Sequence, residues 1–184
     1  MQRNNKSVQA PHMRRTDPRS IVLIGMMGAG KSTVGRRLAV RLGMPFVDAD
    51  DAIEHAAGMS IPEIFARYGE TGFRDGERRV IARLMEEGQQ VIATGGGAFM
   101  NEETRALILE RGLAIWLDAD IDILVERVSR REGRPLLQGK DPRTVLAELA
   151  TIRNPVYAHA PIHIKSGSGP HEHTVDRILE ALEK

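Results

Sequence analysis

A glycine-rich segment that ends in lysine and serine has the residue types and spacing to bind a nucleoside triphosphate. Residues 25–32 read Gly-Met-Met-Gly-Ala-Gly-Lys-Ser and directly follow the apolar run 21–24, which makes a complete G-x-x-x-x-G-K-S phosphate loop between a strand and a helix. Glycines let successive backbone N–H groups and the next helix N-terminus face the phosphate charge. Lys31 would reach the β- and γ-phosphates, and the Ser32 hydroxyl would ligate Mg²⁺.

Two carboxylates lie where a second strand is expected to end. Asp48 and Asp50 follow the apolar pair 46–47, and alternate residues of an extended segment point the same way. One carboxylate would suit a metal-bound water, and the other would suit the proton of a reacting hydroxyl. The alternative is structural, because Asp50 or Asp51 would also serve as the cap of a helix expected around Ile53.

Three glycines and two arginines offer a binding surface for a small acid. Residues 95–97 are all glycine and follow a short apolar strand. They therefore either expose backbone N–H groups to a ligand or form a tight turn. The guanidinium forks of Arg74 and Arg153 suit a planar carboxylate. Each arginine alone would also fit a solvated surface position.

A basic segment without periodicity, over about 130–141, is typical of a lid. Loops that close over phosphates exclude water and bring cations to the charge that develops during transfer. A surface loop that happens to be basic is the other interpretation.

Composition narrows the class of protein. The chain has 184 residues, of which 41% are hydrophobic and 28% charged, as expected for one soluble globular domain. A net charge of +1 and 4% aromatic residues do not favour nucleic acid or membrane partners. The absence of cysteine suits a reducing compartment, and we expect a cytoplasmic protein. The apolar runs are too short to span a bilayer.

The chain ends differ in character from the rest. Basic residues dominate the first twenty positions, which contain no apolar core of the kind that a secretory signal needs, and this predicts a disordered extension over 1–19 before one domain at 20–184. Near the other end, His171 and His173 have a spacing that would chelate a metal, although a solvated pair is the favoured interpretation.

Short apolar runs alternate with amphipathic segments, which predicts an α/β protein with a parallel sheet covered on both faces. Strands are expected at 21–24, 46–47, 91–93, 113–117 and 162–164. Helices are expected from Lys31 to Gly43, around Ile53, from Ser60 to Gly69, over about 72–85, after Asn101, over 121–130, from Asp141 to about Tyr157, and over 175–182.

In order and spacing, these motifs resemble the shikimate kinase family over essentially the whole chain from Ile21 onward. They are the phosphate loop, Phe46 to Asp50 with Ile53-Glu54 behind it, Phe73-Arg74 with Glu77, residues 93–98, Arg134-Pro135-Leu136-Leu137, and Arg153 ahead of Pro155 and Tyr157. The resemblance implies a three-layer P-loop kinase fold of the nucleoside-monophosphate-kinase type, with a central five-stranded parallel sheet, a lid and a substrate-binding region.

The resemblance also implies an activity. The family phosphorylates the 3-hydroxyl of shikimate with ATP, giving shikimate 3-phosphate and ADP in the route to chorismate and the aromatic amino acids. Mg²⁺ would be the cofactor, ATP and shikimate the partners, and a monomer the working unit.

By motif position, the resemblance implies a role for individual residues. Asp50 is expected to hold the shikimate hydroxyls and to accept the proton of the attacking one, while Asp48 orients Mg²⁺-bound water. Arg134 is the expected lid cation that meets the transferring phosphate. Arg127, seven positions earlier, is the expected adenine-stacking residue. The complete implied sets are Asp50, Lys31 and Arg134 for catalysis; Gly28, Ala29, Gly30, Lys31, Ser32, Thr33, Arg127 and Arg134 for ATP; Asp50, Arg74, Gly95, Gly96, Gly97 and Arg153 for shikimate; and Ser32 and Asp48 for the metal.

Three neighbouring residues, Glu54, Phe73 and Glu77, are expected to support the pocket wall and the orientation of Arg74. The chain departs from the family at residues 168–170, which read Ser-Gly-Pro where relatives can carry an arginine two positions before the proline. This departure leaves the adenine contact at that loop open.

Two other functions remain open at this point. A kinase for another small polyol acid, such as gluconate, would share the phosphate loop and the lid, but the Phe73-Arg74, triple-glycine and Arg-x-Pro motifs argue against it. A non-catalytic nucleotide switch would carry a water-orienting residue and switch loops in place of an acceptor pocket.

Overall fold

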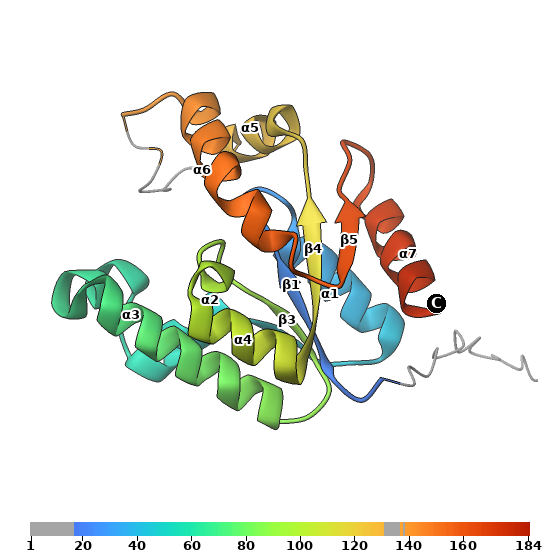
Figure 1. The fold of residues 1–184 in the computed structure, drawn as a ribbon, viewed down its shortest axis with the longest axis horizontal. Coiled ribbons are helices and arrows are strands. Elements are labelled where there is room, and N and C mark those ends of the chain that lie inside the picture. The colour runs from blue at the N-terminus through green and yellow to red at the C-terminus, as the bar shows by residue number, and fades with distance from the viewer. Residues whose placement is uncertain (1–16, 131–136, 138) are drawn as a thin grey trace, which may run out of the picture.

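Five parallel strands form the central sheet of this protein. In the computed structural model, which describes residues 17–130, 137 and 139–184, the strand order is β2-β3-β1-β4-β5 and every neighbouring pair is parallel (Figure 1). The strands are β1 (Ser20–Ile24), β2 (Phe46–Asp48), β3 (Val91–Ala93), β4 (Gly112–Asp118) and β5 (Ile162–Lys165). The predicted sheet is confirmed, with strand ends that differ by one residue.

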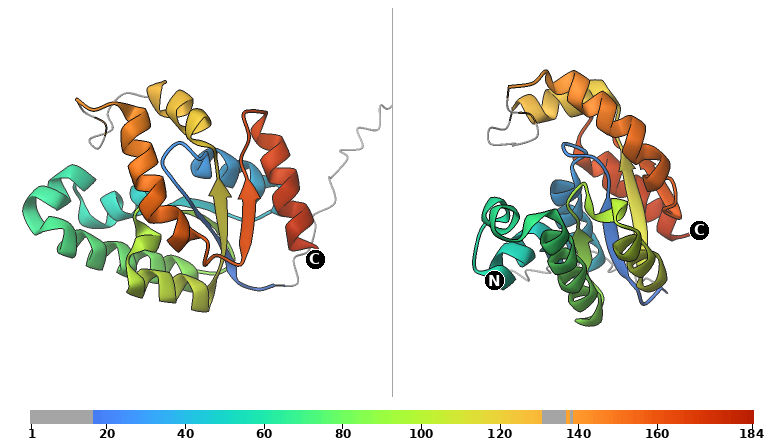
Figure 2. Two further views of the ribbon diagram at one scale, coloured as in Figure 1. Left: turned by 45° about the horizontal axis from the view of Figure 1, so that its top comes forward. Right: turned by 60° about the vertical axis from the view of Figure 1, so that its left-hand side comes forward.

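Helices cover both faces of this sheet, so the fold has three layers. On one face α1 packs against α7, and on the other α4 packs against β4 and is flanked by α3 and α6 (Figures 1 and 2). The helices are α1 (Lys31–Leu42), α2 (Ala49–Ala57), α3 (Ile61–Glu86), the 3-10 helix η1 (Ala98–Met100), α4 (Glu102–Arg111), α5 (Ile121–Ser129), α6 (Pro142–Tyr157) and α7 (His171–Leu182). No helix within the described residues is both long and apolar enough to cross a membrane.

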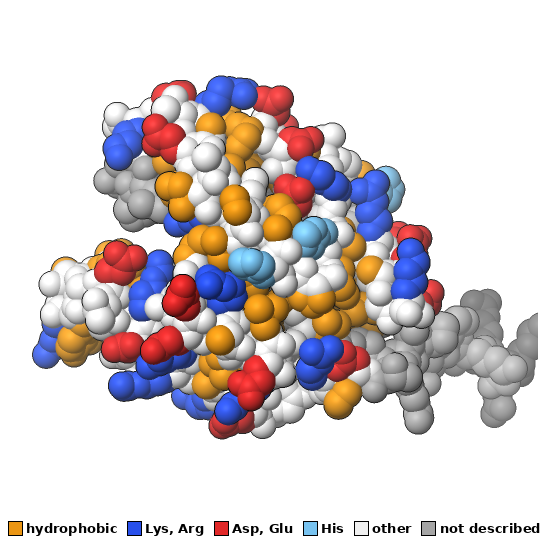
Figure 3. All heavy atoms as spheres, viewed as in Figure 1, with side chains coloured by type: hydrophobic (Ala, Val, Ile, Leu, Met, Phe, Trp, Pro, Cys, Tyr) orange, Lys and Arg blue, Asp and Glu red, His pale blue; other side chains and the backbone are white. Residues whose placement is uncertain are grey.

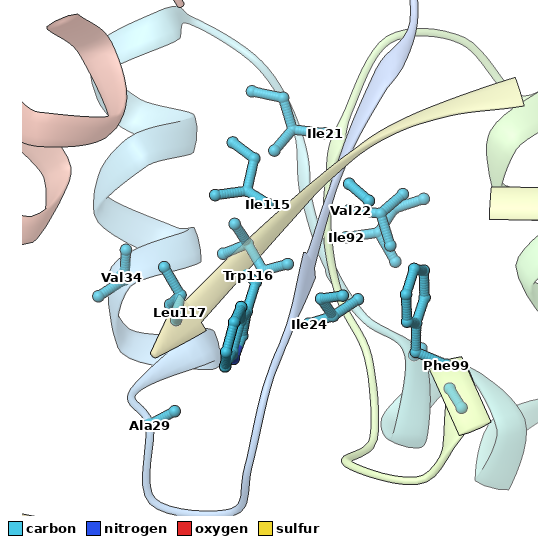
Figure 4. Close-up of a cluster of buried hydrophobic side chains, with 14 of the residues drawn as sticks. Ile21, Val22, Ile24, Ala29, Val34, Ile92, Phe99, Ile115, Trp116 and Leu117 are labelled. Atoms are coloured by element: carbon cyan, nitrogen blue, oxygen red, sulfur yellow. The ribbon is translucent and has the colours of Figure 1, made fainter. Parts of the chain in front are cut away.

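The strand sequences explain why both faces are covered. All five residues of β1 are buried, as expected for a parallel strand with helices on both sides. Ile21 and Ile115 point toward α1, whereas Val22 and Ile24 point toward Phe99 on the opposite face (Figure 4). The alternation of side chains along β1 therefore builds two apolar layers from one short run.

Most helix ends follow the predicted local signals. Gly43 adopts a left-handed conformation with φ 66° after α1, and Ser60 forms a capping box with Glu63 at the start of α3. Asn101 caps α4 and Asp141 caps α6, each through a backbone N–H three residues later. The two helices predicted on either side of Gly69 are merged into α3, with a kink at Gly69, where φ is 69°.

Two predicted boundaries need correction. Asp48, and not Asp50 or Asp51, is the N-cap of α2, since its Oδ1 accepts a hydrogen bond of 3.0 Å from the backbone N–H of Asp50. Helix α7 starts at His171, four residues before the predicted start at Val175. Because of this earlier start, His171 is the first residue of α7.

The expected N-terminal extension falls only partly within the structure, because residues 1–16 lie outside the described residues. Arg19 is described and pairs with Asp17, and its Nη1 donates a hydrogen bond of 3.3 Å to the Gly112 carbonyl. The described end of the extension therefore contacts the start of β4.

Strand register gathers the polar segments at one edge of the sheet. Asp48 pairs with Ala93, and Ala93 pairs on its other side with Leu23. The phosphate loop, the Asp48–Asp50 segment and the triple glycine all leave the sheet at the carboxyl ends of these strands, where open parallel sheets bind ligands.

Candidate active site

The phosphate loop has a backbone that only glycine adopts readily at three positions. Gly25, Gly28 and Gly30 have φ values of 141°, 82° and 93°. A Cβ atom on Gly25 would lie 2.6 Å from the Leu117 carbonyl oxygen, so the loop packs directly on the end of β4. Gly30 precedes α1 without a side-chain cap, which leaves the first N–H groups of that helix open to an anion.

Lys31 lies folded over its own loop. Its Nζ donates hydrogen bonds of 2.8 Å to the Gly25 carbonyl and 2.9 Å to the Met26 carbonyl. Its positive charge lowers the pKa of Asp50, against the larger effect of burial. The ammonium group thus faces both the phosphate loop and the carboxylate predicted to act as a base.

Ser32 and Asp48 present oxygen atoms side by side. The Ser32 hydroxyl donates a hydrogen bond of 2.6 Å to Asp48 Oδ2, while the other oxygen of this carboxylate caps α2. Within the described residues, no group of three or more His, Cys, Asp or Glu residues could hold a metal alone. A hydroxyl and one carboxylate fit Mg²⁺, which usually takes one or two protein ligands together with phosphates and water.

Asp50 is a mostly buried carboxylate at the N-terminal end of α2. Burial and, to a smaller extent, the charge of Asp48 raise the pKa of Asp50, and Lys31 opposes this rise. Its Oδ1 lies only 2.9 Å from the position that a Cβ atom on Gly95 would take. A side chain at residue 95 would therefore displace the carboxylate.

Gly96 and Gly97 also lie so close to a charged side chain that a Cβ atom would contact it. A Cβ atom on Gly96 would lie 3.0 Å from Arg153 Nη1, and one on Gly97 would overlap the guanidinium group of Arg74. Three consecutive glycines thus contact three side chains from α2, α6 and α3. The structure brings together all of the predicted acceptor-site residues.

Arg74 is held in place by Glu77 and Phe73 of the same helix. Its Nη1 donates a hydrogen bond of 2.7 Å to Glu77 Oε2, and Glu77 is only 1% exposed. Burial raises the pKa of Glu77, and the charge of Arg74 opposes that rise. The guanidinium also lies over the Phe73 ring, 5.0 Å from its centroid. Glu54 has a different contact, since its Oε1 accepts a hydrogen bond of 2.8 Å from the backbone N–H of Ile61 at the start of α3.

Tyr157 connects Arg153 to the triple glycine. The buried Tyr157 hydroxyl donates to the Gly96 carbonyl and also hydrogen-bonds the Arg153 guanidinium. Burial raises the pKa of Tyr157 to about 12, so the hydroxyl keeps its proton at neutral pH. The sequence motifs predict no role for Tyr157, although its position four residues after Arg153 places both on one helix face.

Several of the predicted site residues line a cavity of about 570 Å³. In Figure 3 the surface is hollowed between α3 and the part of the molecule formed by α5 and α6, and charged side chains gather along the lower edge of the hollow. Of the predicted site residues, the cavity is lined by Gly28, Gly30, Lys31, Ser32, Thr33, Asp48, Asp50, Gly95, Gly96 and Arg127. Arg74, Gly97 and Arg153 do not line this cavity. Arg153 lies against Gly96, which does line it, and Arg74 lies against the neighbouring Gly97.

Arg127 ties the phosphate loop to the loop after β5. Its Nη1 donates to the Gly28 carbonyl at 3.1 Å and to the Ala29 carbonyl at 3.2 Å, and its Nη2 donates to the Gly167 carbonyl at 2.7 Å. Burial lowers the pKa of Arg127. Its stacking on adenine stays a prediction, and the structure adds a role in joining the two loops.

Comparisons with known proteins agree with this geometry. The family model for shikimate kinase matches residues 27–183. A shikimate kinase from Novosphingobium aromaticivorans is 60% identical over 90% of this chain and 88% of its own length. One from Zymomonas mobilis is 63% identical over 90% of this chain and 94% of its own length. The chain belongs to the shikimate kinase family.

Solved structures of shikimate kinases have the same fold. The enzyme from Acinetobacter baumannii in complex with shikimate aligns with a TM-score of 0.85 and 39% identity over 92% of this chain and 94% of that one. A gluconokinase from Sinorhizobium meliloti aligns with a TM-score of 0.62 and 19% identity, over 92% of this chain and 94% of that one, which shows the fold alone. The predicted family and fold class are confirmed.

Arg134 and most of the lid that the shikimate kinase resemblance predicts at 130–141 lie outside the described residues. The described end of this segment is Asp141, which caps α6. The role of Arg134 stays a prediction.

His171 is the residue that sequence analysis misjudged. It was expected to be solvated together with His173, but it lines the cavity, and its Cε1 lies 3.1 Å from the position of a Cβ atom on Gly30. The available signal was position, because the first helix residue after a parallel strand often faces the ligand edge.

Proposed function

We propose that this chain transfers the γ-phosphoryl group of ATP to the 3-hydroxyl of shikimate, giving shikimate 3-phosphate and ADP. The observation that carries the proposal is the convergence of Asp50, Arg153 and Arg74 on three consecutive glycines beside the phosphate loop. Relatives that are 60% and 63% identical are shikimate kinases, and a structural neighbour was solved with shikimate, which supports the same acceptor.

Arg74 and Arg153 bind the shikimate carboxylate and ring hydroxyls in this proposal. Both guanidinium groups lie at the triple glycine, and both are oriented by partners, Glu77 for Arg74 and Tyr157 for Arg153. A guanidinium group binds a carboxylate through two hydrogen bonds more tightly when its geometry is already fixed. The two arginines therefore set which hydroxyl of the acceptor faces the phosphate loop.

Asp50 is the base in the proposed reaction. As the shikimate oxygen forms its bond to the γ-phosphorus, its proton passes to the Asp50 carboxylate, and the bond to the departing ADP oxygen breaks. The raised pKa of Asp50 improves its match to a base that works near neutral pH. Lys31, which already faces Asp50, would exchange its carbonyl partners for the β- and γ-phosphates.

Ser32 and Asp48 are the residues that would hold Mg²⁺, whose chemistry is to neutralise phosphate charge. Arg134 would add a lid cation. All residues that the proposal uses belong to one chain, so we also propose that the enzyme acts as a monomer on ATP and shikimate without nucleic acid or membrane partners. The cytoplasm suits a chain that has no cysteine.

The test is a coupled assay of ADP release from MgATP with shikimate, with gluconate and with no acceptor. ADP release that requires shikimate is the expected result. Equal rates with gluconate, or release that is independent of any acceptor, would overturn the assignment.

A further inference from the structure

The motif around Arg153 contains a proline that has no part in the proposed reaction. Residues 153–157 read Arg-Asn-Pro-Val-Tyr, and Pro155 lies inside α6, two residues before this helix ends at Tyr157. Proline has no backbone N–H, so Pro155 cannot donate the helical hydrogen bond to the Thr151 carbonyl, and its ring crowds that carbonyl. In a helix interior, proline is the least favourable of all residues.

Packing does not explain why α6 carries this proline. Pro155 is exposed, so its ring adds little to the apolar core. The helix nevertheless continues past it, since the backbone N–H of Ala158 donates a hydrogen bond of 3.0 Å to the Asn154 carbonyl. A residue that breaks a local rule without a gain in packing is expected at functional sites.

The two neighbours of Pro155 that face inward indicate what it does. Arg153 Nη1 lies 3.0 Å from the position of a Cβ atom on Gly96. Tyr157 donates a hydrogen bond to the Gly96 carbonyl and also hydrogen-bonds Arg153. Helix α6 packs against η1, which directly follows the triple glycine. Pro155 therefore lies in the one turn of α6 whose side chains must meet at Gly96.

The side of the helix on which the ring lies determines the direction of its effect. A proline ring pushes away the carbonyl of the preceding turn, so it bends a helix away from the side that carries the ring. Pro155 is on the exposed side of α6, whereas Arg153 and Tyr157 are on the side of the triple glycine. The bend therefore directs the last turn of α6 toward the triple glycine.

We propose that Pro155 is a positioning residue for the acceptor, which sets the direction of the last turn of α6 so that Arg153 and Tyr157 reach Gly96 together. Pro155 acts through Arg153 and does not contact the substrate itself. The inference rests on the proposed function, in which Arg153 binds shikimate. A helix without this proline should be at least as stable and should bind the acceptor less well.

Pro155→Ala tests the proposal. Alanine supplies the missing hydrogen-bond donor, so the melting temperature should stay the same or rise. The KM for shikimate should rise by about 3- to 10-fold, as expected for the loss of about one hydrogen bond, while the KM for ATP stays close. In an Arg153→Lys protein, the same change should add little to the KM for shikimate, because Pro155 acts through the arginine. Steady-state kinetics and melting curves provide the measurements.

Pro142→Ala is the matched control, because Pro142 is the first residue of the same helix, where a missing N–H has no helical acceptor. It should leave both KM values unchanged. The proposal is overturned if Pro155→Ala keeps the KM for shikimate, or raises the KM for ATP equally. A lower melting temperature for Pro155→Ala, or an effect fully additive with Arg153→Lys, would make Pro155 a support of the fold and also overturn it.

Failure of the proposed function has a different signature. If the unchanged protein does not phosphorylate shikimate, the proposed function is wrong and this inference falls with it. If the unchanged protein is active and Pro155→Ala has the same KM for shikimate, the inference alone is refuted.

Discussion

The acceptor wall and the nucleotide wall of the proposed site hold their charged groups in different ways. On the acceptor wall, Arg74 and Arg153 are oriented by a buried carboxylate and a buried hydroxyl from their own helices. On the nucleotide wall, Lys31 and Arg127 donate to backbone carbonyls, including those of the phosphate loop itself. In the proposed site, the acceptor wall is built before substrate arrives, whereas the cations of the nucleotide wall donate, among other partners, to the loop proposed to hold phosphate.

This difference has a physical reason. A small acid gains affinity and a fixed orientation from groups that are already in place, because little ordering remains to be done on binding. Phosphates bring several negative charges, and these compete well with neutral carbonyls for a lysine or an arginine. Changes to the acceptor wall should therefore alter shikimate kinetics selectively, and changes to its supports should act through the arginines.

The largest expected effect comes from Asp50, where the two walls meet. Asp50→Asn removes the proton acceptor, so turnover should fall by about 10²-fold or more, the usual range for general acid–base assistance. The ATP affinity should stay close to that of the unchanged protein. Steady-state kinetics with calorimetry of MgADP binding provides the measurement.

Asp51→Asn is the control for this change, since Asp51 is the adjacent, exposed residue of α2. If Asp50→Asn turns over at close to the rate of the unchanged protein, Asp50 is not the catalytic base. Asp50 would then not connect the acceptor wall to the nucleotide wall.

The second prediction tests the triple glycine. Gly97→Ala places a methyl group on the Arg74 guanidinium, so the KM for shikimate should rise by about 10-fold while the KM for ATP stays close. Gly97 has an ordinary φ of −93°, so the backbone tolerates alanine and the effect reports on Arg74.

Gly76→Ala is the matched control, because a Cβ atom there meets nothing within 4 Å and Gly76 lies inside α3. That change should leave both KM values as they are and stabilise the helix slightly. An equal rise of the ATP KM in Gly97→Ala would show that the two walls are not separable.

A smaller effect is expected from the support of Arg153. Tyr157→Phe keeps the ring and removes the hydroxyl that joins Arg153 to Gly96, so the KM for shikimate should rise by about 3- to 10-fold. Thr151→Ala, which removes an exposed hydroxyl bonded within the same helix, should have no such effect.

A double-mutant cycle with Arg153→Lys decides whether Tyr157 acts through the arginine. If it does, Tyr157→Phe should add little to the KM of the Arg153→Lys protein. Fully additive effects would instead make the hydroxyl a support for the fold, and the acceptor wall would not depend on it for orientation.

The smallest expected effect is on stability. Because burial raises the pKa of Asp50, the folded chain binds this proton more tightly than the unfolded chain does, and stability is lost as the pH rises through the raised pKa. Asp50→Asn cannot ionise, so at neutral pH the ligand-free melting temperature should lie above that of the unchanged protein.

This gain should disappear at a pH below the ordinary carboxyl range, where Asp50 is protonated in both states. Melting curves at neutral and acidic pH measure the difference. A lower melting temperature for Asp50→Asn at neutral pH would mean that the Asp50 carboxylate stabilises the fold, and that its burial does not lower the stability of the protein.

Much of the architecture was predictable because its rules are local. The apolar runs, the capping residues Ser60, Asn101 and Asp141, and the phosphate loop each act within a few residues, so their sequence spacing predicts their structure. The order of the motifs then identified the family, and it predicted roles for Asp50, Arg74 and Arg153.

Contacts between distant segments depended on packing. Only the tertiary structure brought Gly96 against Arg153 and Tyr157, set Arg127 on the phosphate loop, and placed His171 beside Gly30. Each of these contacts joins segments tens of residues apart, where sequence periodicity carries no distance information. The sequence by itself determined which chemical groups the chain possesses, and the packing of α3, α6 and α7 on the sheet decided which of them meet.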